Sequence, residues 1–465
     1  MDAKVKIVAT LGPSTNSRES ISSLIKAGVN IFRLNFSYGT HKEHERTIEN
    51  IRKESERAGK CVAILQDICG PKIRIRGLGR RVAVKRGDRL YMAKEPGENR
   101  FSITHPELIE QMHVGEDLFF ADGTVHVKIV KRSKDMLELE VLTPGTLAEG
   151  KGVNIPDSEI TLSALTEKDK EDLRFGAKAG VDFVAVSFVS HERDVKEARK
   201  IVKDEGAEAW IVAKIERKSA LERLDEIVEA SDAIMVARGD LGAEAGLFRV
   251  PLLQKEIIKK CNEKAKPVIT ATQMLTSMVN SPYPTRAEVS DIANAVLDGT
   301  DAVMLSDETA VGSYPKKAVE VLRDTILQTQ SSCKPLQGME PGAREAFPHA
   351  AVELSKVVPC EFVTALTLSG YTIRHLSRFR PQKPIYAITT EPSLLRKCAI
   401  IWGVVNCIYI EEFESEKELT RKFLKNARLE PSAFLLVTGY LGEKIFQGKS
   451  VRYINRCDLD QPLKS

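Results

Sequence analysis

The stretch WIVAKIE, from Trp210 to Glu216, places four apolar or small residues directly before a lysine, and a fifth apolar residue separates the lysine from a glutamate. Such a run is typical of a buried β-strand. Residues two apart on a strand share one face, so Lys214 and Glu216 are predicted to point the same way from its carboxyl end. Burying two charged side chains is costly unless they have partners or a role. For an isolated pair, a structural ion pair at the strand end is the competing interpretation.

The same strand character recurs along the first 310 residues, with amphipathic helical patterns between the runs. Several of these helical patterns end at a glycine, where a positive φ is favoured. Strands that are apolar along nearly their whole length are buried on both faces, as in a parallel sheet. Eight strand–helix units therefore predict an α/β fold, a (β/α)8 TIM barrel rather than an open sheet. The predicted strands cover residues 4–12, 29–37, 61–68, 181–189, 209–216, 232–240, 266–274 and 300–309.

An insertion interrupts the third unit after Asp67. Short alternating segments with glycine turns replace the expected helix there, which predicts a small β-barrel inserted as a lid after strand 3. After the eighth unit comes a break rich in Pro, Gly and Gln, and the α/β rhythm then restarts as a separate domain with its own sheet. The predicted organisation is a barrel at 1–75 and 151–330, a lid at 76–150, a linker at 331–348 and a C-terminal α/β domain at 349–465, with helices expected at 371–379 and 394–402.

The composition is typical of a soluble globular protein. A net charge of +4 from 69 basic and 65 acidic residues is too balanced to indicate nucleic-acid binding. No apolar run approaches the roughly 18 residues of a membrane span and the N-terminus lacks a signal-peptide layout, so we expect a cytoplasmic protein without a membrane partner. The eight cysteines are scattered without zinc-ligand spacing, and we expect reduced thiols.

In a barrel of this type the active site lies at the carboxyl ends of the strands. Glu216 and Asp240 are 24 residues apart, one βα unit, which places two carboxylates at adjacent strand ends. Such a pair suits a hard divalent cation, Mg²⁺ or Mn²⁺, although two unrelated surface acids are the competing interpretation. Lys214 would then neutralise charge on a transferring phosphoryl group or an enolate. Arg33 and Arg74 could fork onto phosphate oxygens, or each could form a surface ion pair. Polar segments end seven of the eight predicted strands: TLGPST, RLNFS, QDICGPKIR, KIE, ARGD, TATQM and LSDET.

Together with KGVNIP, VSF, PTRAEVSDIANAV and VMLSDETAVGSYP, these segments follow one another in a specific order. In that order the chain resembles the pyruvate kinase family over nearly its whole length. The resemblance implies a catalytic barrel, an inserted lid, and a C-terminal domain for effector binding and oligomerisation. It also implies the glycolytic transfer of a phosphoryl group from phosphoenolpyruvate to ADP, giving ATP and pyruvate, by a homotetramer.

Carried over by position, the resemblance implies a role for each matching residue. The catalytic lysine is Lys214, the divalent-metal ligands are Glu216 and Asp240, and the phosphoenolpyruvate site adds Arg33, Gly239 and Thr272. Thr272 matches the threonine near the face where the enolate is protonated, and Ser306 matches the serine of the proton-relay region. The nucleotide-binding residues would be Pro13, Asn35, Arg74, Asp122 and Lys151, and the monovalent-cation region would be Asn35, Ser37, Asp67 and Ile68.

The segment DICGPKIR departs from the DTKGPEIR of many relatives, with Lys72 in place of the glutamate. In the family a lysine at this position accompanies independence from K⁺, because an ammonium group near Asp67 can supply the fixed positive charge. Tyr38 also stands where many relatives have a histidine next to the nucleotide. In the C-terminal domain, the Ser-Gly turn of TLSGYTIRHLSRF has the right form for a phosphorylated effector. Whether there is such an effector stays open, and Arg374, His375, Arg378 and Arg380 are equally consistent with a solvated helix face.

Two alternative functions remain to be weighed. Another Mg²⁺-dependent barrel enzyme acting on phosphoenolpyruvate or an enolpyruvate would lack the lid and the paired segments LNFS and GPKIR. A catalytically silent sensor of nucleotide or sugar phosphate would be expected to lose Lys214, Glu216, Asp240 or Thr272, and all four are present.

Overall fold

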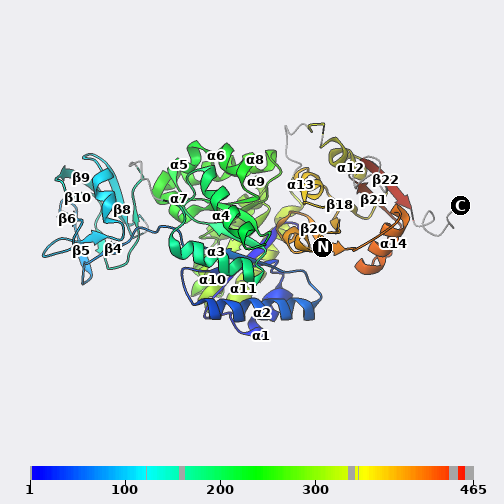
Figure 1. Ribbon diagram of the computed structural model, residues 1–465, viewed down its shortest axis with the longest axis horizontal. Coiled ribbons are helices and arrows are strands. Elements are labelled where there is room, and N and C mark those ends of the chain that lie inside the picture. Colours follow the sequence, from blue (N-terminus) through cyan, green and yellow to red (C-terminus); the bar gives the residue numbers. More distant parts are fainter. Residues whose placement is uncertain are drawn as a thin grey trace.

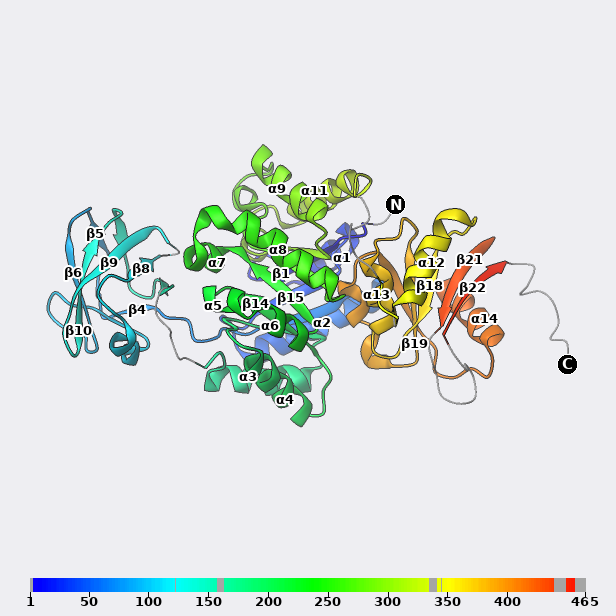
Figure 2. The same cartoon turned by 90° about the horizontal axis from the view of Figure 1, so that it is seen from above.

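The structure, a computed structural model, describes residues 3–121, 123–156, 163–333, 341–343, 345–438 and 449–455. Three bodies lie in a row, with the lid at one end, the barrel in the middle and the C-terminal domain at the other end (Figure 1). Figure 2, seen from above, shows the same order. The lid and the C-terminal domain therefore meet opposite ends of the barrel.

Eight parallel strands close into a barrel in the order β1, β17, β16, β15, β14, β13, β3, β2, which confirms the predicted fold. Every residue of β1, β3, β13, β15, β16 and β17 is buried, and this explains why their sequences are mostly apolar. The strands are β1 (Lys6–Leu11), β2 (Ile31–Asn35), β3 (Ala63–Asp67), β13 (Phe183–Val186), β14 (Trp210–Ile215), β15 (Ala233–Ala237), β16 (Val268–Ala271) and β17 (Ala302–Leu305).

Helices surround the barrel, and their ends carry the expected sequence signals. A capping box begins α2, α3 and α9, in which Thr40, Thr166 and Thr285 accept a backbone hydrogen bond three residues on. Gly28 ends α1 with φ of 119°, which favours glycine. The helices are α1 (Arg18–Ala27), α2 (His41–Ala58), α3 (Glu167–Ala179), α4 (Glu192–Asp204), α5 (Lys218–Glu222), α6 (Leu224–Ala230), α7 (Arg238–Ala245), η2 (Leu247–Arg249), α8 (Val250–Glu263), η3 (Thr276–Val279), α9 (Arg286–Asp298), α10 (Asp307–Ala310) and α11 (Pro315–Gln330).

The lid has a hydrophobic core of its own. Its strands form an antiparallel sheet in the order β12, β8, β9, β10, β6, with two-stranded pairs β11–β5 and β4–β7. Arg74 on the entering chain bridges Gly152 on the returning chain, so the lid stands on two adjacent connections. Its elements are β4 (Ile75–Arg76), β5 (Val82–Val84), β6 (Arg89–Ala93), β7 (Ser102–Ile103), η1 (Pro106–Gln111), β8 (Asp117–Phe120), β9 (Val125–Arg132), β10 (Met136–Val141), β11 (Gly145–Leu147) and β12 (Val153–Asn154).

The C-terminal domain is built on a sheet in the order β20, β19, β18, β21, β22, parallel except for β22. The helix expected at 394–402 is wrong, because this stretch contains only the last residue of one short 3-10 helix, Pro392–Leu394, and a second short one, Lys397–Ile400. Cys398, Ile400, Ile401 and Trp402 are all buried, and packing at the domain junction overrides the helical pattern. The elements are α12 (Ala346–Val357), β18 (Val363–Leu366), α13 (Tyr371–Arg378), β19 (Ile385–Thr389), η4 (Pro392–Leu394), η5 (Lys397–Ile400), β20 (Val404–Tyr409), α14 (Glu416–Ala427), β21 (Ala433–Thr438) and β22 (Ser450–Asn455).

The basic residues of α13 and its end do not form a solvated face. His375, Arg378 and Arg380 are buried. Arg380 reaches across to the barrel, where it donates to Asp301 Oδ1 at 2.8 Å and to Asn262 Oδ1 and the Gly299 carbonyl at 2.7 Å each. Arg380 therefore fastens the C-terminal domain to the barrel, whereas His375 and Arg378 pair with Glu345 of the C-terminal domain itself.

Candidate active site

A cavity of about 160 Å³ lies at the carboxyl ends of the barrel strands. It collects side chains from strands and loops that are far apart in the sequence, as expected for this fold. Most of the predicted site residues line it: Arg33, Asn35, Ser37, Asp67, Ile68, Lys72, Arg74, Lys214, Glu216, Asp240, Thr272 and Ser306.

Lys214 is the centre of the polar network in this cavity. Its ammonium lies 3.0 Å from Glu216 Oε1, 3.2 Å from Asp67 Oδ1 and 2.7 Å from Ser187 Oγ. Burial alone would lower the pKa of Lys214, but the carboxylates of Asp67 and Glu216 outweigh it and hold the pKa above its ordinary value. Lys214 is therefore a fixed positive charge at neutral pH.

Asp67 joins Lys214 to Arg33. The Arg33 guanidinium donates to Asp67 Oδ2 at 2.6 Å and to Thr10 Oγ1 at 3.0 Å. Burial opposes ionisation of Asp67, yet Lys214 and Arg33 lower its pKa, so the carboxylate is charged. Because each Asp67 oxygen faces one cation, the two cations are held at fixed positions under the cavity.

Glu216 and Asp240 line the same wall. Glu216 is 1% exposed, and its Oε2 accepts the backbone N–H of Phe188 at 2.8 Å. Burial raises the pKa of Glu216, Lys214 opposes the rise, and the negative charge of Asp240 adds to it. Asp240 lies in the first turn of α7 and makes no ion pair within the described part of the chain.

This carboxylate pair fits a divalent cation. A cation between the two side chains would relieve the repulsion that raises the pKa of Glu216. Among the described residues, no group of three or more His, Cys, Asp or Glu side chains is arranged to hold a metal ion. The protein would thus supply two carboxylates, and oxygen atoms of substrate and water would complete the coordination.

Thr272 is held in a strained backbone conformation after β16. Its φ is 67° and that of Gln273 is 56°, and a β-branched residue in this region needs support from its surroundings. The Thr272 hydroxyl accepts the Gly239 N–H at 3.0 Å, while the Arg238 guanidinium donates to the Thr272 carbonyl at 2.6 Å. These contacts fix the hydroxyl at the cavity wall beside α7.

Two predicted residues lie apart from this cluster, and a third is not among the described residues. Pro13 lines a neighbouring cavity of about 1080 Å³, together with Arg33, Asn35 and Tyr38. Lys151 is exposed on the returning connection of the lid and lines neither cavity. Asp122 lies outside the described residues.

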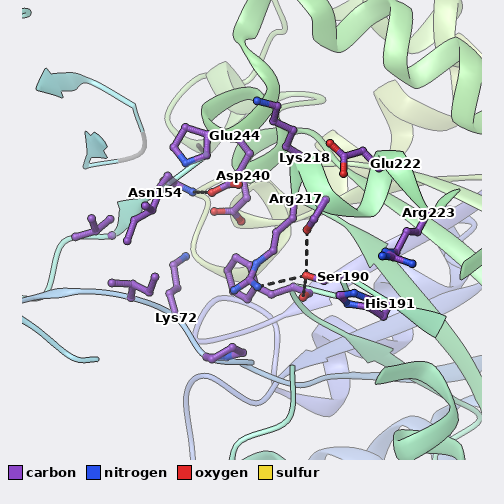
Figure 3. A pocket seen from close by; sticks show the side chains of 18 of the residues that line it. Lys72, Asn154, Ser190, His191, Arg217, Lys218, Glu222, Arg223, Asp240 and Glu244 are labelled. Atoms are coloured by element: carbon purple, nitrogen blue, oxygen red, sulfur yellow. Dashed lines mark hydrogen bonds between the residues drawn. The ribbon is translucent and has the colours of Figure 1, made fainter. Parts of the chain in front are cut away.

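Between lid and barrel lies a further cavity of about 440 Å³, lined on the barrel side by Asp240 (Figure 3). Asn154 of β12 donates to Glu244 Oε1 at 3.2 Å, which links the lid to α7. Lys72 lines both this cavity and the smaller one, but it forms no ion pair with Asp67 or another described carboxylate. The cavity therefore lies between the lid and the barrel, at the end of the site where Asp240 is found.

Sequence reasoning missed several residues that shape the site. Ser187, in the segment VSF, binds Lys214 and donates to the Ile68 carbonyl at 2.7 Å. Phe188 presents its N–H to Glu216 from a φ of 55°. Arg238 is buried and supports the Thr272 loop. The position of VSF at the end of a predicted strand was the available signal for Ser187.

Comparisons with known proteins agree with this geometry. A family model described as "Pyruvate kinase, barrel domain" matches residues 2–319, and one described as "Pyruvate kinase, alpha/beta domain" matches residues 345–438. A protein named "Pyruvate kinase" from Agrobacterium vitis is 45% identical over 412 residues, which is 86% of this chain and 85% of that protein. Proteins of the same name from Staphylococcus aureus and Staphylococcus epidermidis are 41% and 40% identical over 414 residues, which is 86% of this chain and 71% of each relative.

Proposed function

We propose a reaction for this chain from its membership of the pyruvate kinase family of phosphotransferases and from the geometry of the cavity. The chain would transfer the phosphoryl group of phosphoenolpyruvate to ADP, giving ATP and pyruvate in glycolysis. The observation that carries the proposal is the position of Lys214 between Asp67 and Glu216, with Arg33 on one side and Asp240 in the same wall. Such a row of fixed charges suits a reaction in which positioning and charge stabilisation do most of the work.

Lys214 and Arg33 would stabilise the negative charge of the transferring phosphoryl group. Both cations are already oriented by Asp67, so little reorganisation is needed when the substrate binds. Lys214 would also hold the enolate oxygen as the phosphoryl group leaves. Thr272 and Ser306 line the same cavity and are proposed to serve the protonation of the enolate carbon.

Glu216 and Asp240 would hold Mg²⁺ or Mn²⁺. A divalent cation at this place supplies positive charge to the oxygens of the reacting groups. Asn35, Ser37, Asp67 and Ile68 form the equivalent of the monovalent-cation region, where we propose that K⁺ is not required. Lys72 supports this because it lines the cavity that contains Asp67.

The cavity that contains Pro13 and Asn35 is proposed to take the nucleotide, with Arg74 facing its phosphate end from the smaller cavity. Tyr38 is 73% exposed at the edge of both cavities and could stack on the base. Lys151 lines neither cavity and would reach the nucleotide only when the lid moves toward the barrel. Asp122 is proposed as the second lid residue that contacts the nucleotide and its metal. Closure of the lid would also exclude water from the phosphoryl group.

We further propose a cytoplasmic homotetramer. Leu247, Phe248 and Leu252 are 68%, 95% and 69% exposed next to one another at the start of α8, as an apolar contact surface between subunits would be. In the described part of the chain no helix has the length and apolarity to cross a membrane. We also propose that the turn around Ser369 and Gly370 binds a phosphorylated effector.

The test is to follow pyruvate and ATP in time with phosphoenolpyruvate, ADP and Mg²⁺. Omitting ADP and adding a metal chelator are the controls, and both should abolish product. Pyruvate formation that does not depend on ADP would indicate another enzyme of the enolpyruvate class. Tight binding of both substrates without product would indicate a silent sensor.

A further inference from the structure

One part of the cavity of about 440 Å³ between lid and barrel is separate from the proposed substrate sites. The loops that follow β13 and β14, together with α5 and the start of α4, form this part, which we call the Arg217 pocket. Its main residues line neither the active-site cavity nor the cavity proposed for the nucleotide: Ser190, Arg193, Arg217, Ser219, Glu222 and Arg223. The volume of the whole cavity is within the range of small-molecule sites.

Arg217 is a partly buried cation without a close counterion. Its guanidinium lies 5.3 Å from the centre of the Phe188 ring and donates to Ser190 Oγ at 3.3 Å, which is a long contact. It forms no ion pair with a described residue. Burial lowers the pKa of Arg217, and the charges of Glu244 and Glu216 offset this effect only in part. Because a guanidinium has several N–H donors, most of those of Arg217 have no acceptor among the described residues.

Two serine hydroxyls lie next to this guanidinium. Ser190 Oγ accepts from Arg217, and Ser219 Oγ donates to Ser190 Oγ at 3.2 Å. The backbone N–H groups of Ser190 and His191 already donate to Asp194 Oδ2 at 2.9 and 3.0 Å. The free hydrogen-bonding capacity of the pocket therefore comes from side chains, namely one guanidinium and two hydroxyls that can turn toward an anion.

Further cations surround the pocket. Figure 3 shows Arg217 in the middle of the cavity, with Lys72 on one side and Arg223 on the other. Arg193 and Arg223 are exposed, and neither forms an ion pair with a described residue. Five cationic and three acidic side chains line the whole cavity, so it carries a formal excess of two positive charges when His191 is neutral. This excess suits a doubly charged anion.

We propose that the Arg217 pocket binds a small dianion, a dicarboxylate or a phosphate monoester, that is distinct from phosphoenolpyruvate and ADP. One anionic oxygen pair would lie on Arg217 and the hydroxyls of Ser190 and Ser219, where a planar guanidinium can bind two oxygens at once. The remaining charge would face Arg193 and Arg223. Because Asn154 and Lys72 on the lid connections line the same cavity, binding would depend on the position of the lid.

Isothermal titration calorimetry of the full-length protein provides the test. The protein is titrated with succinate, with glycerol 2-phosphate and with acetate, which carries only one charge. Each titration is repeated in the presence of Mg²⁺ and saturating phosphoenolpyruvate, without ADP, so that no turnover occurs. Binding that survives this addition is not binding at the phosphoenolpyruvate site. The titrations without phosphoenolpyruvate test the pocket even if the function proposed above is wrong.

We expect at least one dianion to bind saturably, about ten-fold or more tightly than acetate, because it makes a second charge-assisted contact. Tighter binding of succinate would identify a dicarboxylate, and tighter binding of glycerol 2-phosphate would identify a phosphate monoester. Arg217→Met should weaken binding by about ten-fold or more. If Arg217→Met fails to fold, as judged by thermal unfolding, Arg223→Gln at the exposed edge decides, with several-fold weaker binding expected.

Lys200→Gln is the matched control, because Lys200 is exposed on α4, as Arg193 is, but does not line the cavity. It should bind as the wild type does. Four outcomes would overturn the proposal: no saturable binding of either dianion, acetate binding as tightly as both, loss of binding when phosphoenolpyruvate is present, or unchanged affinity in the folded arginine variants.

Discussion

Replacing Lys214 by methionine removes the central charge of the candidate active site and keeps the length of the side chain. Lys214 lies within 3.2 Å of Asp67 Oδ1, Glu216 Oε1 and Ser187 Oγ, and its side chain is 12% exposed. We expect kcat to fall by about 10²–10³, the range for loss of one preorganised charge-stabilising group. Lys214→Arg should also lose turnover, because the larger planar guanidinium would displace the phosphoryl group.

The same substitution should destabilise the barrel. It leaves Asp67 and Glu216 buried, and breaking a buried ion pair costs about 3–5 kcal/mol. Arg33 still compensates Asp67, so we expect a value of about 3 kcal/mol, at the lower end of that range. The loss should shrink as the pH falls. Without Lys214, the already raised pKa of Glu216 rises further, so the folded state takes up a proton before the unfolded state does.

Two assays separate these effects. Steady-state pyruvate formation at saturating substrates gives kcat, and urea unfolding followed at pH 7.5 and 5.5 gives the stability. Lys53→Met is the matched control, since Lys53 forms an exposed i,i+4 pair with Glu49 on α2 and lines none of the cavities described above. Turnover of Lys214→Met within about two-fold of wild type would refute the role assigned to this lysine.

Four further predictions follow from the same structure. Turnover should be retained in tetramethylammonium buffer without K⁺ or NH₄⁺, and Lys72→Glu should create a requirement for K⁺; loss of nearly all wild-type turnover in that buffer would contradict this. Asp240→Asn should raise the Mg²⁺ concentration needed for half-maximal rate by about ten-fold or more, because one of two carboxylate ligands is lost; an unchanged Mg²⁺ titration would contradict it. Burial lowers the pKa of His375 to about 4, so the unfolded state binds the proton first as the pH falls. The stability of the folded protein should therefore decrease between about pH 6.5 and about pH 4. Urea midpoints of His375→Asn should decrease less steeply over the same range. Arg380→Leu should leave Asp301 without its 2.8 Å partner at the domain junction and separate the thermal unfolding of the two domains; a single unshifted transition would argue against this role.

The barrel could be predicted because its signals are local. Strands buried on both faces are apolar along most of their length, and glycine or threonine marks many helix ends. The pairing of Glu216 with Asp240 could also be predicted, since one βα unit brings adjacent strand ends together. These inferences need only the number of residues between the strands and the repeated strand–helix arrangement of the barrel.

Features that depend on contacts between distant segments could not be predicted. The sequence places Ser187 at a strand end, but its bond to Lys214 follows only from the adjacent positions of β13 and β14. The stretch 394–402 has a helical pattern, but its apolar residues are buried at a junction between two domains. Arg380 gave no sign that its partners lie about 80 and 120 residues away.

The distribution of charge across the cavity connects the predictions on Lys214, Asp240 and K⁺. Asp67 has Arg33 on one oxygen and Lys214 on the other, so the side of β2 and β3 is already compensated by the protein itself. Glu216 shares Lys214 with Asp67, and Asp240 has no ion pair within the described residues. The uncompensated negative charge therefore lies beside α7, at the opposite side of Lys214. A divalent cation is needed at that side, whereas a monovalent cation near Asp67 would add to charges already present. On this argument, chelation of the divalent metal should abolish turnover under conditions in which removal of K⁺ leaves it nearly unchanged.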